Sequence, residues 1–509
     1  MHTNTRKWLV LAPLVLAILV VALDTTIVSV ALPTLAGVLH ASTSQLQWFV
    51  TAYTLVFAAA LVPGGMLGDR YGRKKVLLVA LVIFGAGSLT CALSTSAGMF
   101  IAARAVLGLG GALIFPVTIG VLPVLFDEAE RRKAVAATMA ATLLGFPIGP
   151  IAGGYLLAHA NWSWVFLINL PVVAVAIVAV AVLMPETRAS QKPHFDFPGI
   201  VVSSAGLALL TYGVIETGRH GWGSAAALGA IAGGLVILAG FWLWERRTDD
   251  PLFDLGLFRS RGFTWGTLLA TLVSFAMFGL FFAVPQYYEA VRGTNAQGAG
   301  FGLLPMIGGL LVGAVAADRL AGNAGVKVSA GVGFAISASG LLVGTATRAG
   351  SGLTITIVWT AVFGLGLGFS MPATMDAAIG SLSPERSSVG SGMIQALRMV
   401  GSNFGAAILG SVLNAAYTSR LDLTGLPSAA QTAKQSVEAG VAVAKQLQSP
   451  QLLDSVRAAF VHGIDEVLLV CGVITAVGAV LAVVFLPRRV SAGAAARGTE
   501  PTTSCEDAG

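Results

Sequence analysis

Two ionisable residues lie within long apolar stretches of the sequence, where their chemistry would be the uptake and release of protons. Asp24 sits in L-D-T-T-I-V-S-V-A-L-P, and Arg104 sits in I-A-A-R-A-V-L-G-L-G-G. An ionisable side chain inside an apolar helix at membrane depth is costly, so a functional role is the default expectation. A carboxylate can bind a proton, and a nearby guanidinium favours its ionised form. A helix movement that separated the two groups would therefore change proton affinity.

Counting residues along the helices places these two groups at the same depth. At 1.5 Å per residue, Asp24 lies roughly 22 Å from the inner face and about 8 Å from the outer face of a hydrocarbon core. Arg104, on a helix that runs inward, lies roughly 9 Å below that outer face. We therefore expect an ion pair that couples protons to movement. The alternative is that both side chains only tie neighbouring helices together.

A glycine-rich basic segment, G-G-M-L-G-D-R-Y-G-R-K-K, runs from Gly64 to Lys75. Glycines permit tight turns and close helix approach, and an aspartate at a helix end can cap a helix or pair with basic side chains. This spacing indicates a latch that breaks and re-forms between two conformations, and the alternative is a basic loop that only sets orientation. The latch residues are Gly65, Gly68, Asp69, Arg70, Gly72 and Arg73.

The stretch L-G-F-P-I-G-P-I-A-G-G, from Leu144 to Gly154, has small residues spaced by four. Such residues stack on one helix face and admit close packing, while prolines within the helix add kinks. The residues of this motif are Gly145, Pro147, Gly149, Pro150 and Gly153.

Four further side chains are weaker candidates. Trp48 and Tyr53 could contact an amphipathic substrate, or could face lipid. Glu289 could be an additional titrating group, although a solvated carboxylate at a loop edge is the simpler interpretation, and Asp376 is the other acidic candidate. The histidines lie in polar breaks and the three cysteines form no framework, so we expect no metal site and no cofactor. The absence of G-x-x-x-x-G-K-[ST] argues against an ATP-driven pump.

The elements that must position these residues follow from composition. The chain has 509 residues, of which 56% are hydrophobic and 11% charged, whereas about a quarter of residues are charged in soluble proteins. Continuous apolar runs of about 20 residues predict membrane-spanning helices, and the lack of period-two alternation argues against a β-barrel. Fourteen runs begin near residues 9, 46, 76, 98, 134, 164, 198, 225, 263, 297, 328, 353, 391 and 466.

The basic residues predict the orientation of these helices. With the N-terminus in the cytoplasm, 21 of the 30 lysines and arginines fall on the inner side, as the positive-inside rule requires. Two arginines, Arg104 and Arg398, fall within helices. We therefore expect a multi-pass protein of the inner (cytoplasmic) membrane with both termini cytoplasmic. The net charge of +6 is then explained by the basic residues on the cytoplasmic side, and we do not expect nucleic acid as a partner.

Two basic interruptions, 68–75 and 317–327, each follow the second helix of a six-helix set, which indicates an internal repeat. The predicted domains are a six-helix half over 1–187, two additional helices over 188–250, and a second six-helix half over 251–489. That second half includes a long outer loop at about 415–463 with some helix. The tail, 490–509, has a disordered composition.

Together these motifs resemble the major facilitator superfamily, and within it the fourteen-helix drug:proton antiporters. The segments at Asp24, Gly64–Lys75, Arg104 and Gly145–Gly154 are similar to family motifs, as are W-F-V-T-A-Y from Trp48 and W-S-W-V-F-L-I-N-L-P from Trp162. By this resemblance, Asp24 and Arg104 are proton-coupling residues, the Asp69 loop is the conformational latch, and the glycine motif distinguishes antiporters from symporters.

The resemblance implies a proton-coupled exporter of drugs or other amphipathic or cationic small molecules, working by alternating access and as a monomer. One alternative keeps the fold but exports a lipid or an endogenous metabolite. A membrane enzyme is a further alternative, which the lack of a histidine or carboxylate cluster at depth disfavours.

Overall fold

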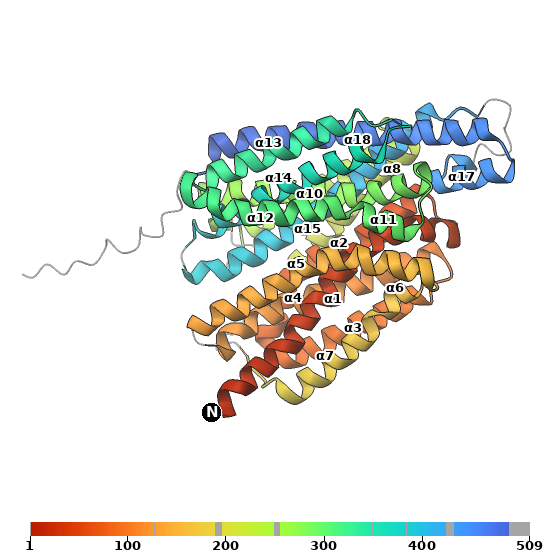
Figure 1. The fold of residues 1–509 in the computed structure, drawn as a ribbon. Coiled ribbons are helices and arrows are strands. Elements are labelled where there is room, and N and C mark those ends of the chain that lie inside the picture. The colour runs from red at the N-terminus through yellow and green to blue at the C-terminus, as the bar shows by residue number, and fades with distance from the viewer. Residues whose placement is uncertain are drawn as a thin grey trace, which may run out of the picture.

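The structure, a computed structural model, is an elongated bundle of helices (Figure 1). It describes residues 2–126, 128–188, 196–248, 255–348, 350–382, 384–423 and 432–487, which include no strand. Within these residues, thirteen helical segments are long and apolar enough to cross a membrane. The all-α membrane fold predicted from the apolar runs is therefore confirmed.

The helices follow one another in chain order. They are α1 (His2–Val38), α2 (Thr43–Tyr71), α3 (Arg73–Ala92), α4 (Ala97–Leu125), α5 (Glu128–His159), α6 (Trp164–Leu167), α7 (Asn169–Leu183), α8 (Phe197–His220), α9 (Ala225–Glu245), η1 (Leu255–Arg259), α10 (Arg261–Gln286), η2 (Tyr287–Val291), α11 (Ala296–Gly302), α12 (Leu304–Ala324), α13 (Val326–Gly344), α14 (Leu353–Ile379), α15 (Pro384–Arg420), α17 (Val437–Gln446) and α18 (Pro450–Phe485).

The predicted count of fourteen spans is confirmed for thirteen. The remaining predicted span coincides with α5, a 32-residue helix that packs along α1 but begins with the charged run E-A-E-R-R-K. The last predicted span, from near residue 466, is the second half of a longer helix. Helix α18 begins at Pro450, where Ser449 caps it by accepting a hydrogen bond from the backbone N–H of Leu452. A search for apolar runs misses this helix start, because the first turns of α18 contain polar residues.

Helix starts are encoded by local polar residues. At the start of α2, the Ser42 hydroxyl accepts a hydrogen bond from the Gln45 N–H, and the Gln45 side chain bonds back to the Ser42 N–H. This capping box satisfies donors that a helix would otherwise leave unpaired. At the other end of α2, Gly72 adopts a φ of 113°, which a side chain would disfavour, and the chain turns sharply into α3.

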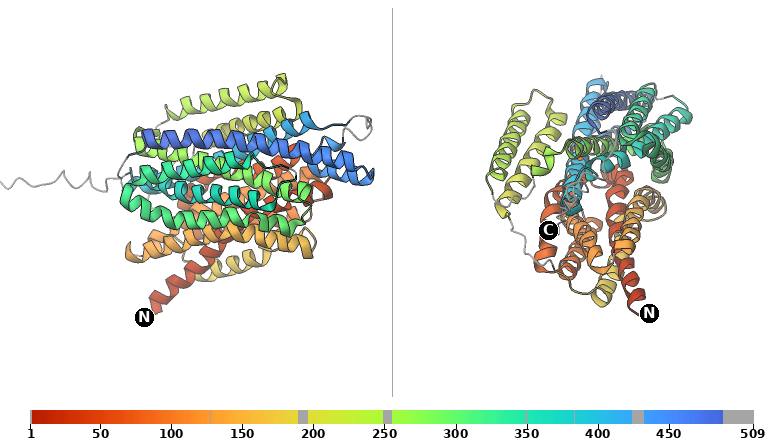
Figure 2. Two further views of the ribbon diagram at one scale, coloured as in Figure 1. Left: turned by 45° about the horizontal axis from the view of Figure 1, so that its top comes forward. Right: turned by 90° about the vertical axis from the view of Figure 1, so that its left-hand side faces the viewer.

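Helices α8 and α9 form a pair at the edge of the bundle, separate from the two main groups (Figure 2). Polar contacts attach this pair to α15. Asn403 donates from Nδ2 to Thr211 Oγ1 at 2.7 Å, and Asn414 donates to the Gly218 carbonyl at 2.6 Å. The additional helices are therefore fastened to the C-terminal group, and α9 exposes most of its surface.

We call the end of the bundle that carries the N-terminus the proximal end, and the opposite end the distal end. The two main groups of helices, α1–α7 and α10–α18, spread apart toward the proximal end (Figure 1). Contacts between them lie toward the distal end. Gln47 Nε2 donates to the Ala407 carbonyl at 2.9 Å, and the Thr43 N–H donates to the Gln435 carbonyl at 2.8 Å. The structure is therefore closed at its distal end.

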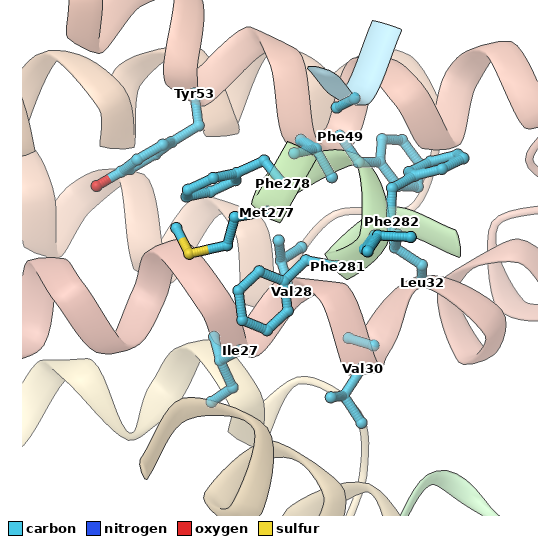
Figure 3. Packing of buried hydrophobic residues seen from close by; sticks show 14 of the residues in the cluster. Ile27, Val28, Val30, Leu32, Phe49, Tyr53, Met277, Phe278, Phe281 and Phe282 are labelled. Atoms are coloured by element: carbon cyan, nitrogen blue, oxygen red, sulfur yellow. The ribbon is translucent and has the colours of Figure 1, made fainter. Parts of the chain in front are cut away.

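Helices α1 and α10 form the apolar part of this closure. Figure 3 shows Val28 and Leu32 of α1 opposite Phe278, Phe281 and Phe282 of α10. All five side chains are buried. Because α1 also carries Asp24, this contact joins the candidate site to the second group of helices.

Candidate functional site

Asp24 and Arg104 form an ion pair in the interior of the bundle. Arg104 Nη1 donates to Asp24 Oδ2 at 2.7 Å, and the two side chains are 0% and 1% exposed. The pair joins the middle of α1 to the first turns of α4. At this burial each charge depends on the other, because removing one partner leaves an uncompensated charge in an apolar interior.

A second donor reaches the same carboxylate from α7. Asn169 Nδ2 lies 3.2 Å from Asp24 Oδ1 and 3.0 Å from Ser88 Oγ, and Ser88 donates in turn to the Phe166 carbonyl at 2.8 Å. Both carboxylate oxygens therefore accept hydrogen bonds. The chain of contacts also holds α1 against α3 and α7.

Helix α2 holds the arginine in place. Arg104 donates from Nε to the Phe49 carbonyl at 2.9 Å, and its guanidinium carbon lies 4.5 Å from the centre of the Tyr53 ring. An arginine over an aromatic face is stabilised electrostatically, more so when water is excluded. The Tyr53 hydroxyl also accepts a hydrogen bond from Thr25, the residue after Asp24, at 3.4 Å. Tyr53 is thus part of the ion-pair environment.

The glycines of α5 lie against the turns of α1 that flank Asp24. A methyl group at Gly149 would meet Thr26 Oγ1 and the Leu23 carbonyl, and one at Gly145 would meet Ala22. Gly153 faces Ile27 in the same way. Small residues let the two backbones approach closely, so these glycines set how near α5 comes to the aspartate.

This arrangement can do one kind of chemistry. The carboxylate has no exposed surface in the distal-closed conformation, so a proton can reach it only after helices move. Withdrawal of Arg104 would leave the Asp24 carboxylate without its counter-ion in the interior of the bundle. The chemistry that this arrangement can perform is the uptake and release of a proton at a carboxylate whose access depends on helix movement.

The glycine-rich basic segment lies at the proximal end, between α2 and α3. Asp69 Oδ1 accepts two hydrogen bonds from Arg73, at 2.7 Å from Nη2 and 3.0 Å from Nε. The N–H of Arg73 donates to the Thr187 carbonyl, and the N–H of Lys74 donates to Glu186 Oε1. Asp69 is thus paired within its own segment, which is anchored beyond the end of α7.

The other latch residues lie nearby. Gly65 and Gly68 face Pro116 and Val117 of α4, where larger residues would crowd the helix contact. Arg70 is half-buried and lies beside its neighbour Tyr71.

Comparison with known proteins settles the family. The model of the Major Facilitator Superfamily matches residues 14–406, which include both members of the ion pair. The chain belongs to the Major Facilitator Superfamily.

Several curated relatives within this superfamily are similar along most of their length. The tetracenomycin C resistance and export protein of Streptomyces glaucescens is 35% identical over 80% of this chain and 76% of its own. The multidrug efflux pump LfrA of Mycolicibacterium smegmatis is 34% identical over 95% of this chain and 97% of its own.

A solved structure shows the same fold. The bacterial homologue of the human lysosomal transporter Spinster, inward-facing and unoccupied, superposes with a TM-score of 0.68, covering 94% of this chain and 96% of that one at 16% identity. The major facilitator fold is therefore shown for this chain.

Two of the weaker candidates lie away from the ion pair. Trp48, on α2, packs on a small apolar cluster of α8 and α15 at the side of the bundle. Asp376 is exposed near the proximal end of α14. Of the candidate residues predicted from the sequence of this superfamily member, Arg104, Tyr53 and the α5 glycines lie around Asp24.

Glu289 is not the solvated loop-edge carboxylate that the simpler interpretation expected. It lies in the π-helical segment η2, and its Oε1 is buried without a hydrogen-bond partner among the described residues. Glu438, at the start of α17, lies close enough to act on it electrostatically. Burial raises the pKa of Glu438 from 4.5 to about 7. The interpretation fails because α17 and α18 both pack against η2, which apolar periodicity alone does not show.

Sequence reasoning missed Asn169 and Ser88 as site residues. The signal for Asn169 is present, because it is a single amide within the apolar run V-F-L-I-N-L-P-V-V. Ser88 has no comparable signal, since serines are common in membrane helices and its neighbours are unremarkable in type.

Proposed function

We propose that this protein is a proton-coupled antiporter that exports drugs or other amphipathic small molecules. The buried Asp24–Arg104 pair is the observation that carries the proposal, because ionisable groups at membrane depth cost free energy and a functional role is therefore the default expectation for them. The export and resistance functions named for the relatives support the substrate class. The protein acts as a monomer in this proposal.

Asp24 binds the transported proton, and Arg104 is its counter-ion. In the distal-closed conformation the carboxylate is paired with Arg104 and accepts a hydrogen bond from Asn169. Opening at the distal end separates the apolar contact between α1 and α10, moves α1 relative to α4, and exposes the carboxylate to protons. The return movement carries the proton to the other side, where Arg104 displaces it.

The Asp69–Arg73 segment acts as the latch of this cycle. Its pairing at the proximal end belongs to the conformation in which that end is spread, and closing the proximal end would offer Asp69 other partners. The α5 glycines keep α1 and α5 in close contact while the two groups of helices move.

In this proposal the proximal end faces the cytoplasm, and both termini lie there, in the inner (cytoplasmic) membrane. The excess of basic residues at this end supports the orientation. Protons then enter from the distal side. One proton moving through 100 mV supplies about 2.3 kcal/mol, which supports a substrate gradient of roughly 50-fold.

Reconstituted protein tests the function. We expect addition of a hydrophobic cationic dye, rhodamine 6G, to purified protein in weakly buffered detergent to release protons, and a pH gradient to drive dye transport in liposomes. Protein-free liposomes and a collapsed gradient are the controls. Dye transport at the same rate with and without a pH gradient would rule out proton coupling. Absence of dye transport would rule out this exporter function.

A further inference from the structure

A second buried arginine, Arg398, lies in the C-terminal group and has no part in the mechanism above. It is located on α15, about 12 Å along the helix from the start of the span at Gly390, and its side chain is 8% exposed. It is therefore well inside the membrane-spanning part of the helix, where an arginine is costly.

The partners of Arg398 are all neutral. Nε donates to Ser274 Oγ of α10 at 3.1 Å, and Nη1 donates to Gln395 Oε1 at 3.2 Å. Nη2 lies 3.9 Å from the Met371 sulfur of α14, which is a weak acceptor. Within the described residues no carboxylate forms an ion pair with this guanidinium.

The contrast with Arg104 is informative. Asp24 neutralises Arg104, whereas Arg398 keeps an unmatched positive charge where three helices meet. The other buried charged side chains of the described residues, Asp196 and Glu245, lie at the ends of α8 and α9. A buried cation with only neutral acceptors forms stronger hydrogen bonds when an anionic oxygen is supplied.

We propose that Arg398 binds the acidic group, a carboxylate or phenolate, of an exported aromatic molecule. This proposal rests on the efflux function above and narrows its substrate class. Ser274 and Gln395 hold the guanidinium in position, and Phe278, one helical turn after Ser274 on α10, offers an aromatic surface nearby. Helix α10 also contacts α1, and Phe278 lies in that contact (Figure 3). Ser274 of the site is therefore one helical turn from the surface that separates when the distal end opens.

Two dyes that share a xanthene ring but differ in charge provide the test. Liposomes containing wild-type protein are given a pH gradient, and export of fluorescein, an anion, is compared with export of rhodamine 6G, a cation. We expect wild type to export fluorescein, and Arg398→Gln to lower the ratio of fluorescein to rhodamine 6G export by about 10- to 100-fold, the value of a charge-assisted hydrogen bond. Arg398→Lys keeps the charge and restores part of the ratio.

Arg420→Gln is the matched control, because it removes an exposed arginine from the end of the same helix and leaves the ratio unchanged. The binding of each dye is also measured at equilibrium, using only the monodisperse fraction of each variant. This measurement distinguishes a loss of binding from a loss of folded protein. In that measurement Arg398→Gln weakens fluorescein binding more than rhodamine 6G binding.

The results distinguish this site from the general function. If wild type exports rhodamine 6G but not fluorescein, or if Arg398→Gln leaves the ratio of the two dyes unchanged, the Arg398 site is overturned and the exporter proposal stands. If wild type exports neither dye, both proposals fail.

Discussion

Replacing Gly149 by alanine would place a methyl group in the contact between α5 and α1, beside the turn that carries Asp24. The new Cβ would lie 2.9 Å from the Leu23 carbonyl oxygen and 3.1 Å from the Ile27 nitrogen, and it would overlap Thr26 Oγ1. Two of these atoms are backbone, so α1 itself must shift. Overpacking of this kind costs about 1–3 kcal/mol.

The shift would also reach the ion pair. A displacement of a few tenths of an ångström at Leu23 or Ile27 moves Asp24 relative to Arg104, whose present separation is 2.7 Å. Because a hydrogen bond between charged groups contributes about 1.5–3 kcal/mol, we expect proton-driven transport to fall at least about 10-fold. The assays are initial rates of gradient-driven dye uptake in liposomes and resistance to unfolding by added SDS.

Gly308→Ala is the matched control, because a methyl group at this helical position of α12 meets no atom within 4 Å. The control should keep wild-type stability and transport. If Gly149→Ala also kept both, the close α1–α5 contact would have no role in positioning Asp24.

Three further perturbations test other parts of the account. Asn169→Ala removes a hydrogen-bond donor to Asp24 Oδ1, so gradient-driven transport should fall by roughly 10-fold, the value of a hydrogen bond to a charged group; an unchanged rate refutes a role for this contact. Arg73→Gln should slow transport more than 10-fold with less than about 1 kcal/mol lost stability, since its pair with Asp69 is partly exposed; equal transport rates contradict the latch. Because burial raises the pKa of Glu438, docking of α17 favours protonation and weakens as pH rises through about 7. Hydrogen-exchange protection over 437–446, corrected for the faster intrinsic exchange at high pH, should be lower at pH 8 than at pH 6, and Glu438→Gln should abolish that difference in protection.

The sequence was sufficient for the fold because the apolar runs are long and almost free of charge. Depth counting along two such runs also brought Asp24 opposite Arg104, since helix rise is nearly constant and the membrane gives both helices a common reference. The rotation of each helix about its axis is not available from such counting. The sequence therefore offered Tyr53 only as a possible substrate contact. In the structure its ring lies under the Arg104 guanidinium.

Contacts between distant segments were harder to predict. Glu289 lies in η2, against which α17 and α18 pack, and α17 begins nearly 150 residues later in the chain, so no local pattern near residue 289 encodes these contacts. The early start of α18 was missed because its first turns are polar, although Ser449 and Pro450 are a recognisable start signal.

The most direct test of the account is to separate proton coupling from substrate binding at Asp24. Asp24→Asn would leave Arg104 as an unpaired buried charge, so the double variant Asp24→Asn/Arg104→Gln, which removes both charges, is measured beside it. In liposomes, rhodamine 6G exchange between equal concentrations on the two sides needs no proton gradient, whereas concentrative uptake does. We predict that both variants lose concentrative uptake and that the double variant retains exchange. Concentrative uptake at the wild-type rate by either variant would contradict the assignment of Asp24 as the proton-binding residue.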